Sequence, residues 1–396
     1  MVAGSAVLIG LTIPYAIACL IDPAHLSDFE QFYAGGWILR LHMGSQLYNF
    51  ATNVGVGVAH TGFSSNMYVH PSFEALLYYP FAFLPFRLAY CAYCAFNFGL
   101  LYFVHRTLRP YLNALGSTGS WLQGALYLSF LPIPHAIFQG QDSVLFLLLI
   151  ALSFARLSEG DLLAAGFIAG FANFRFQNAL FILALFIVWR MWKFVAGFLV
   201  SGSICVLSFA MVSGWRSFIE YVKVLTWLDG YLRMNSFMVS LRGVLFASGV
   251  SSKVSMAVTA IAVFAVAAWR GRDGSPDKRF LIAIVAMCLA SFHMFVYDLA
   301  VLIVPILMLA EAALGANNRW LLATSGLFLA SPTVLFTFLP ASYSWTLCAM
   351  QILLFVACSE RSRGFALHDR RNAGRVRPGE KRVITGIMNS SRVMLP

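Results

Sequence analysis

Residues 254–294 read "VSMAVTAIAVFAVAAWRGRDGSPDKRFLIAIVAMCLASFHM". Two apolar runs flank the link 270–279, which contains four of the chain's 27 lysine and arginine residues. Each run is close to the length that an α-helix needs to cross a hydrocarbon layer of about 30 Å. Short basic links between membrane helices lie mostly on the cytoplasmic side. The stretch therefore predicts a helical hairpin in a membrane, with its tip in the cytoplasm.

The composition extends this interpretation to the whole chain. The 396 residues are 60% hydrophobic and only 11% charged, with a mean hydropathy of +0.77, whereas about a quarter of the residues of a soluble domain are charged. We therefore expect an all-α polytopic membrane protein. The net charge of +11 does not indicate nucleic acid, because the basic residues cluster in short links and in the C-terminal tail. The few cysteines lie mostly inside apolar runs and form neither a metal-binding spacing nor a disulfide framework.

The apolar runs predict twelve transmembrane helices with both chain ends in the cytoplasm. We expect spans at 3–21, 88–105, 121–138, 143–157, 161–174, 177–191, 194–212, 254–269, 280–294, 297–313, 319–337 and 342–358. This layout places 19 of the 27 lysine and arginine residues on the cytoplasmic side, as the positive-inside rule requires. The stretch "HPSFEALLYYPFAFLPF" (70–86) is short and contains three prolines. We expect it to form a re-entrant or interfacial helix on the outer face.

Two regions follow from this layout. Residues 1–358 form the transmembrane domain, and residues 359–396 form a basic cytoplasmic tail. The tail is polar and rich in Gly, Ser and Arg, which is typical of a disordered segment that rests on anionic lipid.

Polar residues gather on the predicted outer face in five separate clusters. These are Asp28 and Glu30 after the first span, "FQGQDS" (138–143), "NFRFQN" (173–178), "NSFMVSLRG" (235–243) and "SFHMFVYD" (291–298). Ionisable groups near membrane depth are costly and usually functional. The coincidence of five clusters on one face predicts a single site just outside the bilayer.

Each cluster also has a purely structural interpretation. Asp28 is a favourable N-cap residue for a helix over 28–41, and Asp298 for the span that follows it. The stretch that contains Gln141 fits a tight turn, and Arg175 fits a side chain that extends to lipid headgroups. In the same way, His293 fits a packing role, and Asn235 and Arg242 fit an ordinary loop. The sequence alone leaves these alternatives open.

The residue types at this site suit sugar transfer from an anionic lipid. Arg175 and Arg242 suit a phosphate, because guanidinium groups bind it through paired donors. A carboxylate in the same pocket suits a general base that acts on a hydroxyl group. The aromatic rings of Phe29, Tyr33, Trp37 and Tyr68 suit a sugar. The sequence contains no phosphate loop, no dinucleotide-binding glycine motif, no H-E-x-x-H or G-x-S-x-G motif and no D-x-D pair, so a soluble nucleotide-activated donor is not expected.

The order of these motifs resembles glycosyltransferase family 87, the polyprenyl-phosphate-mannose-dependent mannosyltransferases of the GT-C superfamily. The resemblance covers roughly residues 20–340. It rests on six modest motifs in the right order, which are "DFEQFYAGGWILRLHMGSQLY" (28–48), "HPSFEALLYYPFAFLPFRLAY" (70–90), "GQDS" (140–143), "FRFQ" (174–177), "NSFMVSLRG" (235–243) and "HMFVYDLAVLIVP" (293–305). It implies a GT-C-like fold with juxtamembrane helices at 28–41 and 70–86.

The resemblance also implies roles for individual residues. Asp28 would be the general base that deprotonates the acceptor hydroxyl, and Arg175 would replace the family's lysine at the donor phosphate. His293 would lie beside donor or acceptor. The remaining pocket residues would be Gln141, Asn235, Arg242, Tyr297, Asp298 and Tyr33. The chain departs from the family pattern where Lys-Pro has become Arg175-Phe176, Pro-Pro has become His70-Pro71 and Asn has become Asp142.

The expected activity is inverting transfer of mannose from a polyprenyl-phosphate donor to the hydroxyl of a glycolipid or glycan, on the extracytoplasmic face of a bacterial inner membrane. No cofactor and no metal-ligand set is expected from the motifs, and metal dependence stays open. Two other interpretations remain: a transporter or flippase for a lipid-linked sugar, and a ligase for surface polysaccharide with His293 as its catalytic residue. The absence of a clear internal repeat and the one-sided polar residues favour the enzyme over the transporter.

Overall fold

A computed structural model describes residues 2–23, 27–62, 67–116, 120–231, 238–250, 252–338 and 343–359. Over these ranges the regular structure is entirely helical, without strands, which confirms the predicted all-α class. The first half contains α1 (Val2–Ile21), α3 (Phe29–Arg40), η1 (Gly44–Gln46), α4 (Phe50–Thr61), η2 (Ser72–Glu74), α5 (Ala75–Tyr78), η3 (Tyr79–Phe83), α6 (Phe86–Leu108), η4 (Arg109–Tyr111), α7 (Asn113–Gly116), α8 (Ser120–Ser129), α9 (Pro132–Gln139), α10 (Ser143–Ser158), α11 (Leu162–Gly170), η5 (Phe171–Arg175) and α12 (Phe176–Val188).

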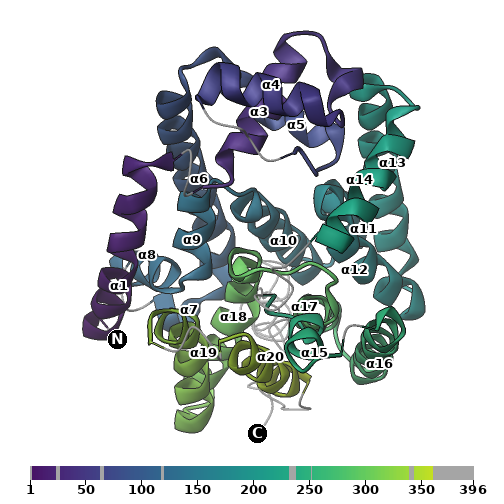
Figure 1. Cartoon of the computed structure of the whole chain (residues 1–396). Helices are drawn as coiled ribbons and strands as arrows, with labels where there is room; N and C mark the ends of the chain where they lie inside the picture. The colour runs from purple at the N-terminus through teal and green to yellow at the C-terminus, as the bar shows by residue number, and fades with distance from the viewer. Residues whose placement is uncertain are drawn as a thin grey trace, which may run out of the picture. The chain divides into compact units, whose positions relative to one another are not determined.

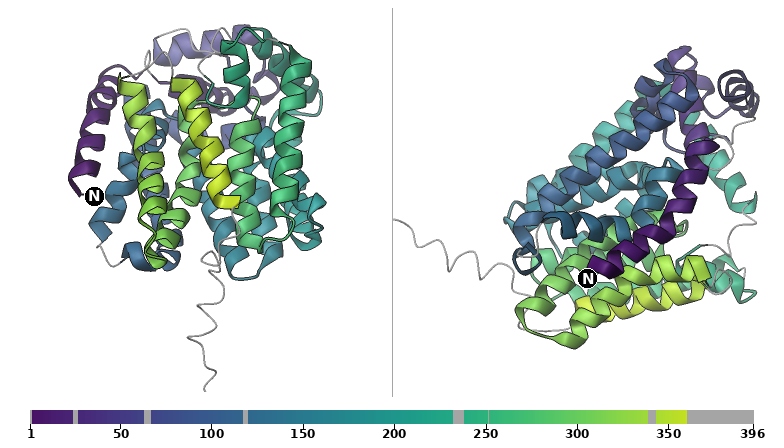
Figure 2. Two further views of the ribbon diagram at one scale, coloured as in Figure 1. Left: turned by 90° about the horizontal axis from the view of Figure 1, so that it is seen from below. Right: turned by 90° about the vertical axis from the view of Figure 1, so that its left-hand side faces the viewer.

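The second half of the chain is also helical, and all its elements belong to one helical unit, 1–360. It contains α13 (Trp192–Ser213), α14 (Ser217–Tyr231), α15 (Leu241–Ala247), α16 (Lys253–Gly271), α17 (Pro276–Ala290), η7 (Val296–Leu302), α18 (Ile303–Gly315), α19 (Arg319–Phe338) and α20 (Tyr343–Ser359). The helices α19 and α20 run side by side in Figure 2. The predicted cytoplasmic tail lies outside the described residues, apart from Ser359.

Seven helical runs in the described part of the chain are long and apolar enough to cross a membrane. They are Gly4–Ile21, Phe86–Tyr111, Leu162–Val188, Trp192–Ser213, Lys253–Gly271, Val296–Gly315 and Arg319–Phe338. Two shorter apolar helices are Ser143–Ser158 and Trp345–Ser359. The protein is therefore a helical chain of multi-pass membrane character. The full set of twelve crossings remains a prediction.

The run Leu162–Val188 reverses direction at η5. A Cβ atom on Gly166 of α11 would overlap the backbone of Phe194, and one on Gly170 would overlap Phe198 and Ser201 of α13. Contacts that advance together along both helices show that α11 and α13 run parallel. Since α13 begins only three residues after α12 ends, α12 must run back toward the start of α11. The chain therefore turns around at Phe171–Arg175, where the sequence predicts a turn. The two arms, α11 with 9 residues and α12 with 13, are each shorter than the spans predicted at 161–174 and 177–191.

The proline-rich stretch 70–86 forms the short elements η2, α5 and η3, none of which is long enough to cross a bilayer. The elements α5 and η3 pack against α3, and η2 packs against α13. In Figure 1 α3, α4 and α5 lie together at the top, beside the ends of α6 and α13. The contact between α3 and α5 is close, because a Cβ atom on Gly36 would lie 2.7 Å from the carbonyl oxygen of Tyr78. These helices cover the end of the bundle at which the predicted polar clusters lie.

The predicted third span, 121–138, is two helices rather than one. Proline at the first position of α9 fits a helix start but cannot continue α8, because it lacks an N–H group, and the break falls at Phe130 and Leu131. At its other end α9 stops at Gly140, which has φ +73°. The N–H of Gln141 bonds the carbonyl of Ala136 at 2.9 Å, which is the bond that closes a Schellman motif. Because α9 ends here, the next three residues, 141–143, lie in the candidate site.

Candidate active site

Asp28 stands between α1 and α3, at the edge of the polar cluster. It occupies the N-cap position of α3, yet its side chain caps no backbone N–H group. Instead, its Oδ2 accepts a hydrogen bond of 2.6 Å from Nε2 of Gln141, and its own N–H donates to the carbonyl of Gln139 at 2.9 Å. The structure therefore favours the site interpretation of Asp28 over the simple capping interpretation.

The electrostatic environment of Asp28 keeps its proton affinity high. Burial raises the pKa of the Asp28 carboxyl above its ordinary value, and hydrogen bonds from Gln139 and Gln141 only partly oppose this. No lysine or arginine in the described part of the chain lies within ion-pair distance of this carboxylate. A partly buried carboxylate held by neutral amides suits a general base, because its pKa is moved toward neutral pH.

Arg175 lies at the centre of the cluster and is almost completely buried. Its Nε donates to Asp142 at 3.0 Å, with a second and closer contact from Nη2. Its Nη1 pairs with Asp298 at 2.7 Å, and Nη2 also donates to the amide oxygen of Gln141 at 3.2 Å. The guanidinium is therefore not extended to lipid headgroups. It joins residues from three parts of the chain, and most of its donors are already used.

Asp142 and Asp298 differ from Asp28 because each is paired with Arg175. Burial alone would raise the pKa of Asp142, but the charges of Arg175 and His70 and the hydrogen bonds from Arg175 and Glu74 together outweigh burial, and the pKa is lowered. Asp298 has two roles, since its Oδ2 accepts from the N–H of Phe295, the N-cap residue of η7, at 2.9 Å, while its Oδ1 accepts from Arg175 and Ser143. Asp298 is therefore not the N-cap residue that the sequence predicts, because it lies at the third position of η7 and bonds back to the N-cap backbone.

His293 and Arg242 lie in two neighbouring segments, which together form what we call the Arg242–His293 wall of the cluster. Nη1 of Arg242 donates to the carbonyl of Phe292 at 2.7 Å, and its guanidinium lies 3.6 Å from the centre of the Phe292 ring. The backbones of the two segments also pair, with Val239 N–H donating to Met294 at 2.9 Å. Burial lowers the pKa of His293 to about 3, helped by the charges of Arg175 and Arg242. His293 is therefore neutral at physiological pH and offers a hydrogen bond rather than a charge.

The structure thus brings together most of the residues that the sequence singled out. Asp28, Gln141, Arg175 and Asp298 are linked by direct bonds. The Tyr297 ring lies 6.0 Å from the Arg175 guanidinium. Asn235 lies outside the described residues.

The aromatic rings expected to hold a sugar are packed on other rings. Tyr33, Phe29 and Tyr68 are almost completely buried. The Tyr33 hydroxyl donates to the carbonyl of Leu84 at 2.7 Å, and Trp37 stacks on His60 with centroids 3.6 Å apart. Their faces hold α3 against the neighbouring helices, so they support Asp28 from behind.

Sequence reasoning missed one pair in this cluster. His70 Nδ1 lies 3.1 Å from Oε2 of the buried Glu74. Burial raises the pKa of Glu74, and the neighbouring Asp142 raises it further, whereas burial lowers the pKa of His70 to about 4. The available signal was one acidic residue within the apolar stretch 70–86, four positions after a histidine.

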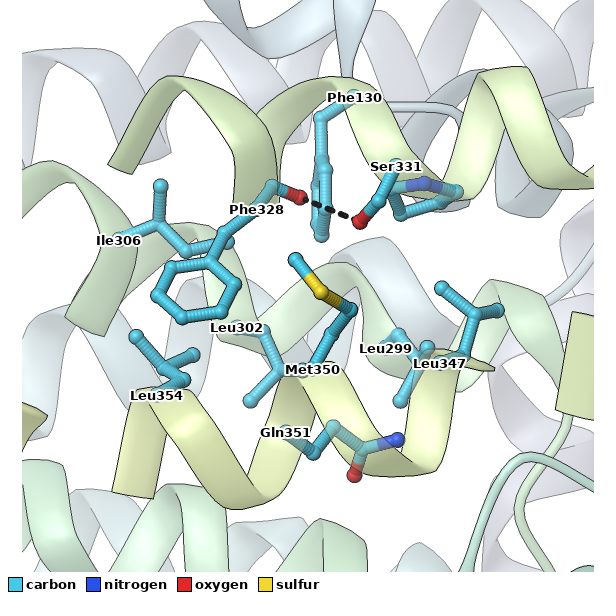
Figure 3. A pocket seen from close by; sticks show the side chains of 11 residues that line it. Phe130, Leu299, Leu302, Ile306, Phe328, Ser331, Leu347, Met350, Gln351 and Leu354 are labelled. Atoms are coloured by element: carbon cyan, nitrogen blue, oxygen red, sulfur yellow. Dashed lines mark hydrogen bonds between the residues drawn. The ribbon is translucent and has the colours of Figure 1, made fainter. Parts of the chain in front are cut away.

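A separate apolar pocket lies between η7, α18, α19 and α20. Figure 3 shows Phe130, Leu302, Phe328 and Met350 pointing into it, with Gln351 at its edge. Its cavity volume of about 20 Å³ has room for about one water molecule, whereas pockets for organic ligands measure about 300–1,000 Å³. The pocket is therefore a packing gap that is too small for a sugar donor.

Comparison with known families supplies the reaction class. The profile of glycosyltransferase family 87 matches residues 68–294, more than half of the chain. The chain belongs to glycosyltransferase family 87. The matched region of this family 87 protein includes Gln141, Arg175, Arg242 and His293, whereas Asp28, Tyr33, Tyr297 and Asp298 lie outside it. No curated protein and no solved structure matches the chain. The resemblance inferred from the motifs is confirmed, and with it glycosyl transfer.

Proposed function

We propose that this glycosyltransferase moves mannose from a polyprenyl-phosphate donor to an acceptor hydroxyl on the extracytoplasmic face of a bacterial inner membrane. The observation that carries the proposal is the contrast between Asp28 and its neighbours. Arg175 forms ion pairs with Asp142 and Asp298, while Asp28 is held by an amide and keeps a raised pKa. A general base needs a carboxylate with a raised pKa that is not paired with a cation, as Asp28 is here.

The proposed reaction is a single displacement at the anomeric carbon. The acceptor oxygen forms a bond to that carbon while its proton passes to the Asp28 carboxylate. The bond between the anomeric carbon and the phosphate oxygen breaks, and the phosphate leaves with the bonding electron pair. The configuration at the anomeric carbon inverts. Because a phosphate is already a good leaving group, this mechanism needs no strong general acid.

We place the donor phosphate near the wall formed by Arg242 and His293. Arg242 is anchored by the Phe292 carbonyl, and the neutral His293 beside it adds a hydrogen-bonding nitrogen. Arg175 acts here mainly through its charge and through the positions of Gln141 and Asp142, because its donors are largely engaged. This role refines the direct phosphate contact that the family resemblance implies.

The twelve-helix layout supports the location of the site. Asp28 follows the end of α1, Gln141 precedes the start of α10, and Arg175 lies at the reversal between α11 and α12. Helix ends that meet in this way belong to one side of the bundle. The basic link joins the end of α16 to the start of α17, whereas the segments before α16 and after α17 contribute Arg242 and His293 to the site. The link and the site therefore lie at opposite ends of these two helices. Because the positive-inside rule puts the basic link in the cytoplasm, we assign the site to the extracytoplasmic side.

The deciding experiment uses purified protein in lipid with radiolabelled polyprenyl-phosphate-mannose and a membrane-lipid extract. Transfer of label by the wild type and its loss in Asp28→Asn would support the proposal, and the labelled product would identify the acceptor. Transfer that depends on His293 but not on Asp28 would overturn it in favour of ligase chemistry. Movement of labelled donor across the bilayer without a new product would indicate a flippase.

A further inference from the structure

Three side chains next to the proposed base converge on one point. They are His70 and Glu74, from the stretch that carries η2, and Asp142, from the turn before α10. Each offers one ligand atom, and these atoms all lie within 4.8 Å of one another. Glu74 and Asp142 are 4% and 0% exposed, so water provides little compensation for their charges.

Two oxygen atoms in this cluster have no hydrogen-bond partner. Glu74 uses Oε2 toward His70 and leaves Oε1 unpartnered, while Asp142 uses Oδ1 toward Arg175 and leaves Oδ2 unpartnered. Buried polar atoms almost always have a partner, and leaving a charged group without one is costly. A proton shared by the two carboxyl groups, or a cation bound between them, would satisfy these oxygens.

One separation in this cluster, between His70 and Glu74, fits the edge of a metal-coordination sphere. Nitrogen and oxygen ligands lie at about 2.0–2.2 Å from Zn²⁺, so two adjacent ligands of one ion are about 3.0–3.5 Å apart. His70 Nδ1 and Glu74 Oε2 are 3.1 Å apart. The two residues are four positions apart, with His70 in the bend that precedes η2 and Glu74 at the end of η2.

The balance of acidic and basic side chains at the site also favours a bound cation. Asp28, Glu74, Asp142 and Asp298 are four acidic groups, against the charges of Arg175 and Arg242. An anionic donor phosphate would add further negative charge to this region. A divalent cation would correct the imbalance without adding another side chain.

We propose that His70, Glu74 and Asp142 bind one divalent transition-metal ion, Mn²⁺ or Zn²⁺. One imidazole and two carboxylates form a mixed nitrogen and oxygen set, which these ions accept, whereas Mg²⁺ and Ca²⁺ prefer oxygen ligands alone. Arg175 orients Asp142 from the outer side, as second-shell partners of metal-binding carboxylates do. The ion would tie the α5 region to the start of α10. This site goes beyond the proposed transfer reaction, because its occupancy can be measured without turnover, and it departs from the sequence expectation of no metal ligands.

The test measures metal content in the full-length protein in lipid nanodiscs. The protein is stripped with a chelator, exposed to Mn²⁺ or Zn²⁺ separately and desalted, and bound metal is counted by mass spectrometry, with electron paramagnetic resonance for Mn²⁺. The wild type should retain about one ion per chain. Glu74→Gln and His70→Asn should each weaken binding at least tenfold, on the order of the loss caused by disturbing even second-shell partners. The control Glu220→Gln removes an exposed carboxylate on α14 and should bind like the wild type.

A second measurement guards against misfolded variants. Added metal should raise the melting temperature of the wild type and of Glu220→Gln, but not that of Glu74→Gln. If the wild type retains neither metal after desalting, the proposal is overturned, and a proton shared between Glu74 and Asp142 accounts for their oxygens. Because this criterion uses the wild-type protein alone, it holds even if every variant fails to fold.

Discussion

The side-chain amide of Gln141 donates a hydrogen bond of 2.6 Å to the carboxylate of Asp28, although 113 positions separate them in sequence. The oxygen of the same amide accepts from Arg175 at 3.2 Å. The two bonds fix the orientation of the amide, with its nitrogen toward Asp28 and its oxygen toward the guanidinium. Arg175 therefore acts on Asp28 through a neutral amide, and Asp28 keeps the proton affinity that a base requires.

Replacement of Asp28 by asparagine should remove transfer activity and leave the protein at least as stable. General-base assistance contributes about 10²–10⁴-fold, so kcat should fall by about that factor. The neutral amide avoids the cost of a buried charge, so the melting temperature at pH 7 should not decrease. The assay is radiolabel transfer together with a thermal melt. Turnover close to that of the wild type would remove Asp28 from the mechanism.

The pH profile of transfer should show one acid limb, above the ordinary range of an aspartate. Burial raises the pKa of Asp28, and only the ionised carboxylate accepts a proton, so kcat/KM should fall as pH decreases through that raised pKa. The pKa values of His70 and His293 are lowered to about 4 and about 3, so neither adds an imidazole limb near pH 6.5.

The same shift has a consequence for stability. The folded state holds the Asp28 proton more tightly than the unfolded chain does, so the contribution of Asp28 to stability decreases as pH rises from the unfolded pKa to the folded one. Asp28→Asn should remove this decrease. An acid limb of activity that stays in place in Asp28→Glu and in His293→Asn would argue that another group is the base.

Loss of the Arg175 guanidinium should destabilise the protein more than any surface charge change. Arg175→Met leaves Asp142 and Asp298 buried without their cation, and removal of one partner from a buried pair costs about 3–5 kcal/mol. The melting temperature of Arg175→Lys should lie between those of the wild type and Arg175→Met, because lysine keeps the positive charge but lacks the planar guanidinium group. The measurement is the melting temperature in detergent.

The matched control is Arg156→Met at the other end of α10, where Arg156 pairs with Glu159 on the surface. Exposed pairs contribute only about 0–1 kcal/mol, so this variant should melt near the wild type. In Arg175→Met, the further change Asp298→Asn should recover part of the loss. Equal melting temperatures for Arg175→Met and Arg156→Met would mean that the buried network does not support the fold.

The helical class and the gathering of polar residues could be predicted because both depend on local composition. Apolar runs mark helices wherever they occur, and the turns at 138–143 and 173–178 contain polar residues that no lipid-facing helix would tolerate. The partner of each charge could not be predicted, because pairing depends on how α10, η5 and η7 meet in space. The sequence thus predicts Arg175 at a phosphate, and the structure places it between Asp142 and Asp298.

The packing of α3 shows the same limit. Tyr33 and Phe29 have the composition of a sugar-binding surface, and only the tertiary structure reveals that other rings cover them. Glu74 escapes sequence reasoning for a similar reason. A single acidic residue in an apolar stretch gives no periodic signal, and its significance appears only when Asp142 is brought beside it from a distant turn.

Gly140 should be far less tolerant of alanine than another glycine with the same backbone conformation. Gly140 has φ +73° and a Cβ atom there would lie 2.5 Å from Cβ of Phe29, whereas Gly62, with φ +83°, has open space around it. Both substitutions incur the cost of a left-handed conformation, about 1 kcal/mol. Only Gly140→Ala also pushes Phe29 and its neighbour Asp28 away from Gln141.

The comparison therefore isolates the contact beneath the proposed base. Gly62→Ala should show a slightly lower melting temperature and normal transfer activity. Gly140→Ala should melt lower still, and its kcat should fall by at least tenfold, because a displacement of about 1 Å from a reactive geometry can cost about 10²-fold. If Gly140→Ala transfers sugar at the rate of Gly62→Ala, the position of Asp28 against the α9–α10 turn does not control catalysis, and the assignment of the base fails with it.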